Sequence, residues 1–148
     1  MISVTYIDLS ADRSTPLMQL REENTTRSIH IAVSDYDANR LALQGFKFIT
    51  IKTDGVAETL IKALKATVVE VVFTLETTQT VKCSIAIALD GKISKIDARP
   101  GEAVLLALKF DAPILVEEEL FYAKNDTITL KERLRSMSTI DFGHAIFQ

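Results

Sequence analysis

The chain has 148 residues, of which 47% are hydrophobic and 25% charged, and its formal net charge is −3. This length is typical of a single domain with a sizeable core, and the composition excludes disordered and fibrous proteins. The negative balance argues against a nucleic-acid binder that is basic over its whole surface, although a local basic patch remains compatible with it.

The cysteine content and the apolar runs indicate the compartment. The single cysteine, Cys83, excludes an internal disulfide framework and favours a reducing environment. Its place in an alternating apolar stretch predicts a small buried strand residue. No segment has the pattern of a secretion signal, and no apolar run approaches the ~18 residues of a membrane span. We therefore expect a cytoplasmic protein with no membrane partner.

Strands dominate the first part of the chain. Weak alternation predicts a strand over residues 2–9, and a second is predicted over 16–21. Apolar and polar residues alternate cleanly over 29–33, which predicts a third strand.

Two helices are predicted next. Ser34 is a good N-cap for a helix that ends near Gly45. A short apolar run at residues 46–51 follows, and Thr53-Asp54 is predicted to cap a second helix that reaches Leu64.

A hairpin is the strongest local signal of the second half. Strands are predicted over residues 68–75, 80–89 and 92–98, and Asp90-Gly91 joins the last two as a tight turn.

An apolar helix begins at Pro100, where the missing N–H costs nothing, and Glu102 lies in its first turn near the positive end of the helix dipole. Ala112-Pro113 ends this helix, and residues 114–116 form a short buried strand.

The two helices that precede short apolar runs resemble one another. Residues 37–43 (DANRLAL) align with residues 102–108 (EAVLLAL), and each half then contains the order βββαβα. The predicted fold is α+β, a single domain with an internal duplication of this unit and mixed or antiparallel sheets packed with helices.

Residues 96–119 carry a family signature. An Ile-Asp-Ala-Arg-Pro run is followed by an acidic residue and Ala, a Leu-Ala-Leu helix, Ala-Pro-Ile and a glutamate run, and this order resembles the bifunctional nuclease (BFN) domain. The resemblance covers roughly residues 16–122, so residues 1–124 are predicted as the BFN-like domain. The signature residues are Ile96, Asp97, Ala98, Arg99, Pro100, Glu102, Ala103, Leu106, Ala107, Leu108, Ala112, Pro113, Ile114, Glu118 and Glu119.

The resemblance implies a nuclease that hydrolyses phosphodiester bonds of DNA or RNA. Such chemistry commonly uses carboxylates that hold Mg²⁺ or Mn²⁺ and a cation that contacts the phosphate. Asp97, Glu118 and Glu119 are the candidate metal ligands, and Asp97, Arg99 and Glu102 the candidate catalytic residues. Arg99 is also the candidate phosphate clamp, since arginine can bind phosphate bidentately.

One family motif is changed in this chain. The Thr-His-Asp sequence that opens the second helix in many members aligns with Thr53-Asp54-Gly55, so the histidine and the aspartate are both replaced. Asp54 stands partly in their place, which makes it a second candidate for substrate binding.

The same residues have a structural interpretation. Glu102 can be a helix-dipole residue, Arg99 its salt-bridge partner, and the glutamates at 117–119 an exposed face. Under this interpretation the protein is a non-catalytic ligand- or partner-binding regulatory module of the same fold.

The remaining residues, 125–148, are predicted as a tail. An amphipathic helix is expected over residues 127–137, with Leu130 and Leu134 on its apolar side. Because strongly β-forming strands must pair or cover their sheet edges, we also expect a homodimer.

Overall fold

The computed structural model describes residues 1–43, 55–77 and 80–122. The apolar run at residues 46–51, Asp54 and the tail helix predicted over residues 127–137 lie outside these ranges. The elements are β1 (Ile2–Asp12), β2 (Thr15–Glu22), β3 (Ser28–Ala32), α1 (Asp35–Leu43), α2 (Val56–Ala63), β4 (Thr67–Leu75), β5 (Val81–Leu89), β6 (Lys92–Asp97), α3 (Pro100–Lys109), β7 (Ile114–Val116) and α4 (Glu119–Tyr122).

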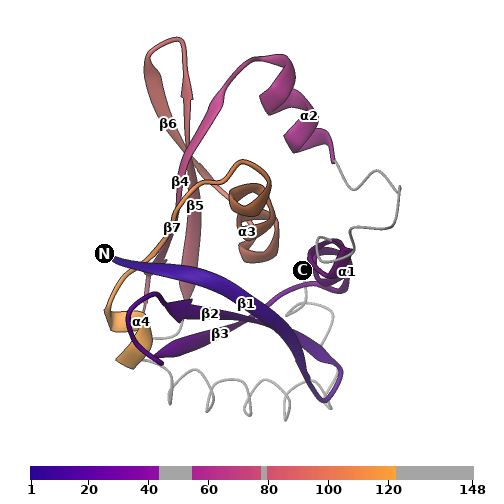
Figure 1. Cartoon of the computed structure of the whole chain (residues 1–148), viewed down its shortest axis with the longest axis vertical. Helices are drawn as coiled ribbons and strands as arrows, with labels where there is room; N and C mark the ends of the chain where they lie inside the picture. Colours follow the sequence, from indigo (N-terminus) through magenta and orange to yellow (C-terminus); the bar gives the residue numbers. More distant parts are fainter. Residues whose placement is uncertain (44–54, 78–79, 123–148) are drawn as a thin grey trace.

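The strands form one sheet in the order β3-β2-β1-β7-β4-β5-β6. Every neighbouring pair is antiparallel except β4 and β7, which are parallel. The sheet bends, so that β4–β6 run upright in Figure 1 while β1–β3 cross the lower part of the picture. The predicted α+β class and mixed sheet are confirmed.

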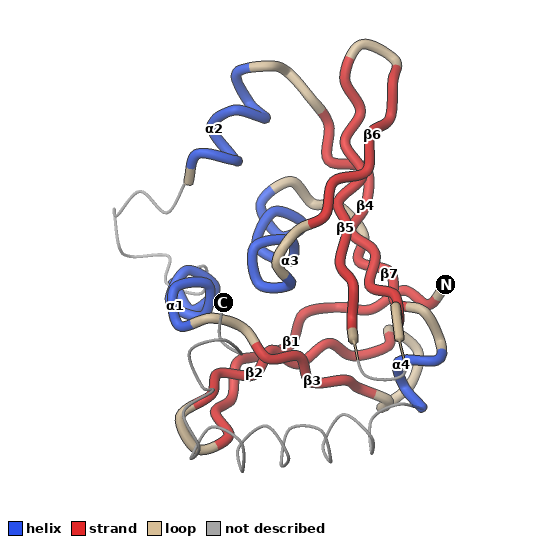
Figure 2. Tube along the Cα trace, turned by 180° about the vertical axis from the view of Figure 1, so that it is seen from behind, coloured by secondary structure: helices blue, strands red, loops and turns tan. Residues whose placement is uncertain are grey.

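Helix α3 lies at the centre of the fold. It packs against β4 and β5, while α1 packs against β1 and β2 and contacts α3, as Figure 2 shows from behind. Residues 103–107 are each at most 2% exposed, as expected of a helix that is apolar all round. Within the described ranges, no helix is long and apolar enough to cross a membrane.

Local signals set several element boundaries as predicted. The Ser34 side-chain oxygen accepts the N–H of Asp37 at 3.1 Å and so caps α1. Pro100 is the first residue of α3, with Arg99 as N-cap. Asp90 and Gly91 have φ of 51° and 78°, and this pair of left-handed residues makes the tight β5–β6 turn.

The start of α2 differs from the prediction. Thr53-Asp54 was expected to cap this helix, whereas Gly55 is its N-cap and Val56 its first residue. The Glu58 carboxylate accepts the Gly55 N–H. Glycine is itself a favoured N-cap residue, and the Glu58 carboxylate supplies the reciprocal half of a capping box by accepting the N–H of the N-cap residue.

Each half of the chain contains an antiparallel three-stranded meander followed by a helix, β1–β3 with α1 and β4–β6 with α3. The segment that would correspond to β7 in the first half, residues 46–51, lies outside the described residues. The internal duplication therefore stays a prediction.

Burial of Cys83 makes stability depend on pH at the alkaline end. Cys83 is 4% exposed on β5, as predicted, and desolvation raises the pKa of its thiol from 9.0 to about 12. Above pH ~9 the unfolded chain binds fewer protons than the folded one, so stability should fall by up to about 1.4 kcal/mol per pH unit until the folded pKa is reached. Urea unfolding of wild type and Cys83→Ala at a series of alkaline pH values measures this. The difference in unfolding free energy between wild type and Cys83→Ala should shrink as pH rises. An equal pH dependence of the two proteins would contradict this prediction.

Candidate functional site

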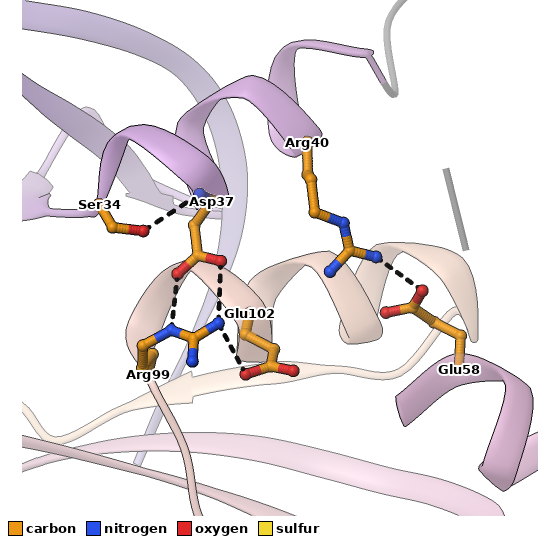
Figure 3. Close-up of polar contacts among 6 residues, drawn as sticks. All are labelled: Ser34, Asp37, Arg40, Glu58, Arg99 and Glu102. Carbon is orange, nitrogen blue, oxygen red and sulfur yellow. Dashed lines mark hydrogen bonds and ion pairs between the residues drawn. The ribbon is translucent and has the colours of Figure 1, made fainter. Parts of the chain in front are cut away.

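Arg99 joins the first turns of α1 and α3. Its Nε lies 3.1 Å from Asp37 Oδ2, and its Nη2 lies 3.3 Å from Asp37 Oδ1 and 3.1 Å from Glu102 Oε2. Figure 3 shows the guanidinium between the two carboxylates. The Asp37 side chain is only 2% exposed, whereas that of Arg99 is 56% exposed. The buried carboxylate therefore holds a cation that still reaches the surface.

Close packing of α1 and α3 brings these groups together. Asp37 and Glu102 are each the third residue of their helix. A Cβ on Gly101 would lie 2.6 Å from the Asp37 Cβ, so only glycine lets the first turn of α3 approach α1 this closely.

The donors of Arg99 are unevenly used. A guanidinium has five N–H groups: one on Nε and two on each Nη. The Nε N–H and the two N–H groups of Nη2 are directed at the Asp37 and Glu102 carboxylates, while Nη1 has no partner among the described residues. The hydrogen bond to Asp37, helped by the charges of both carboxylates, raises the pKa of Arg99 above its usual value. The predicted bidentate phosphate fork is thus already filled on its Nε–Nη2 side, and one nitrogen remains for a ligand.

A second ion pair links α1 to α2. Arg40 Nη2 lies 2.7 Å from Glu58 Oε2, and the side chains of Arg40 and Glu58 are 10% and 0% exposed. Figure 3 shows this pair beside the Asp37–Arg99 pair. The other oxygen, Glu58 Oε1, is buried and has no hydrogen-bond partner in the described part of the chain. This pair fixes α2 on the helix that carries Asp37.

The structure does not bring the candidate metal ligands together. Asp97 ends β6, is 78% exposed and lies 3.7 Å from Lys82. Glu118 and Glu119 are exposed residues that follow β7. Strands β5 and β4 separate β6 from β7, which amounts to about 14 Å at the usual ~4.8 Å strand spacing.

The Glu118 carboxylate interacts with neighbouring side chains. Its carboxylate is 3.9 Å from Arg27 Nη2 and accepts the Tyr122 hydroxyl at 3.4 Å. Asp54, the second candidate for substrate binding, lies outside the described residues.

The donor set does not fit a bound divalent ion in the part of the chain that is described. Mg²⁺ and Mn²⁺ need several oxygen ligands around one point. Among residues 1–43, 55–77 and 80–122, no three Asp, Glu, His or Cys side chains are placed to share a metal ion. No catalytic step through a metal follows from these residues.

Sequence reasoning missed Asp37 and the Arg40–Glu58 pair. The signal for Asp37 was available, because the helix alignment pairs it with Glu102, and both carboxylates bind Arg99. Glu58 carried a weaker signal, as a carboxylate in the first turn of α2, three residues after Gly55.

The signature at residues 96–119 lies within a longer segment that matches a known protein family. No curated protein matches the chain. The family model described as the bifunctional nuclease domain matches residues 18–129, a segment that includes α1, α3 and every carboxylate and arginine of the site described above. The chain therefore belongs to the bifunctional nuclease domain family.

Proposed function

We propose that the protein is a nuclease that hydrolyses phosphodiester bonds of DNA or RNA, and that the scissile strand binds at Arg99. Mg²⁺ or Mn²⁺ belongs to this proposal on the family resemblance alone, because the described carboxylates do not form a shared metal site. The observation that carries the proposal is the half-exposed Arg99, fixed by two carboxylates at a helix start within the family match. A fixed cation on a rigid element can position a phosphate without reorganisation of its own.

Cleavage of labelled single- and double-stranded DNA and RNA, with Mg²⁺, Mn²⁺ or a chelator, tests the proposal. Arg99→Lys keeps the charge beside Asp37 but removes the Nη1 donors, so we expect cleavage to fall at least about tenfold, equivalent to ~1.4 kcal/mol of transition-state stabilisation. Arg27→Lys is the matched control, because Arg27 is also a surface arginine paired with a carboxylate, Glu22, at 2.8 Å.

Two outcomes would contradict this proposal. One is a wild-type protein that cleaves none of these substrates with either metal. The other is equal cleavage by wild type and Arg99→Lys. Asp97→Asn, an exposed change on β6, separately tests whether the predicted carboxylate contributes.

A specific observation favours a second function. Three of the five Arg99 donors already bind protein carboxylates, as in a structural joint, and this suits a non-catalytic module that binds a ligand or partner. Such a module would show no cleavage but a saturable rise in thermal stability with its ligand.

The sequence also predicts a cytoplasmic location and a homodimer. Microscopy of a tagged chain tests the first. The second is developed from the sheet edge below.

A further inference from the structure

Strand β6 leaves one edge of the sheet open. It is the last strand of the order and has a single neighbour, β5, among the described residues. All six of its residues are exposed, and the apolar Ile93 and Ile96 are 65% and 49% exposed. An open edge that carries apolar side chains is a template for another strand.

The hydrogen-bond pattern shows which groups face outward. The Ala98 N–H donates to the Cys83 carbonyl at 3.0 Å. Because bonded and non-bonded pairs alternate along an antiparallel ladder, every second residue counted back from Ala98 also bonds to β5. The residues between them, Ile93, Lys95 and Asp97, direct their N–H and C=O groups to the open edge.

This pattern limits how a second copy can add to β6. A two-fold antiparallel pairing must join outward-facing residues to one another, so the axis passes through one residue of the strand. An axis on any charged residue places like charges opposite one another, which destabilises the pair. An axis on Ile93 or Ser94 aligns no opposite charges. An axis on Ile96 places Lys95 of each copy opposite Asp97 of the other, which makes two opposite-charge pairs.

Pairing about an axis at Ile96 would also extend the apolar core across the sheet edge. Ile96 ends a row of apolar residues that lie side by side across five strands. The first four are at most 4% exposed, whereas Ile96 is 49% exposed and has no strand on its far side within residues 1–43, 55–77 and 80–122. The row is Val4, Ile114, Val71, Ile85 and Ile96.

We propose that two copies of the chain pair through β6, antiparallel about a two-fold axis at Ile96, and so join their sheets. Ile96 then meets its own copy as a non-hydrogen-bonded pair, the closer of the two antiparallel arrangements. Opposite-charge pairs between Lys95 and Asp97 flank it on both sides.

Charge exchange tests this register in solution. Light scattering behind a sizing column should give a dimer for wild type, twice the 16.4 kDa of the chain. Lys95→Asp places carboxylates opposite one another, and the dimer dissociation constant should rise at least tenfold. Lys95→Asp combined with Asp97→Lys restores the opposite charges and should restore the dimer. Lys92→Asp makes the same charge change outside the paired segment and should leave the dimer as in wild type.

A cysteine placed on the axis gives an independent readout. Ile96→Cys should oxidise to a disulfide-linked dimer, since the two Cα atoms lie within bridging distance, whereas Ile93→Cys should not. The native Cys83 is 4% exposed, and burial raises the pKa of its thiol to about 12, so it should stay reduced.

Several results would overturn the proposal. They are a wild-type monomer at all concentrations, a dimer that Lys95→Asp leaves unchanged, and a crosslink through residue 93 rather than 96. A dimer that Leu60→Glu dissociates while Lys95→Asp does not would place the interface on the exposed side of α2, where Leu60 is 53% exposed. None of these readouts depends on nuclease activity.

Discussion

Arg40→Ala is expected to lower the free energy of unfolding by about 3–5 kcal/mol, because it leaves the Glu58 carboxylate buried without its cation. The Glu58 side chain is 0% exposed and lies 2.7 Å from Arg40. Its Oε1 already lacks a partner in the described part of the chain, so without Arg40 the carboxylate keeps the Gly55 N–H as its hydrogen-bond donor among the described residues. Urea unfolding measures the loss, and amide hydrogen exchange should show α2 losing protection first.

Two variants separate this effect from the loss of any ion pair. Arg40→Met with Glu58→Met removes both charges and should recover most of the stability. Lys82→Ala breaks an exposed pair with Asp97, whose side chains are 47% and 78% exposed, and should cost less than about 1 kcal/mol. A loss below about 1 kcal/mol in Arg40→Ala would mean that the Glu58 carboxylate is not desolvated.

Predictions succeeded where a boundary depends on neighbouring residues. The Asp90-Gly91 turn, the Ser34 cap and the Pro100 start each follow from a few residues and their backbone preferences. The start of α2 was misplaced because its N-cap is Gly55, which has no side-chain acceptor that a sequence pattern would reveal. The Glu58 carboxylate, inside the helix, accepts the Gly55 N–H.

The weak alternation of the first strand has a physical cause. A bulge adds Ile7 between the pairs Tyr6–Leu20 and Asp8–Gln19, and an extra residue reverses the side on which later side chains lie. The pattern is therefore broken within β1, although the strand continues to Asp12.

The placement of the carboxylates depends on sheet order, which local patterns do not encode. Asp97 and Glu118 lie close in sequence, but the chain after β6 crosses through α3 and enters the sheet between β1 and β4. The same crossover brings Arg99 to Asp37, 62 residues away. The family signature thus grouped one set of carboxylates, and the sheet topology brings a different set together around Arg99.

Under the proposed function, Asp37→Asn should lower both stability and cleavage, because the Asp37 carboxylate holds the Arg99 guanidinium in place. The carboxylate makes two hydrogen bonds to the guanidinium at 3.1 and 3.3 Å and is 2% exposed. Hydrogen bonds to charged groups contribute roughly 1.5–3 kcal/mol, so we expect unfolding in urea to show a loss of about 2–3 kcal/mol. Glu102→Gln should cost less than about 1 kcal/mol, since that side chain is 26% exposed.

The activity of the double variant tells positioning apart from general destabilisation. If Asp37 acts on catalysis only by holding Arg99, Asp37→Asn should reduce cleavage at least about tenfold in the wild-type background and add little in the Arg99→Lys background. Ser34→Ala removes the α1 cap, at about 0.5–2 kcal/mol, but keeps the Asp37–Arg99 pair, so it should lower stability without this loss of cleavage. Equal, additive losses from Asp37→Asn in both backgrounds would mean that Asp37 influences cleavage by a route other than Arg99.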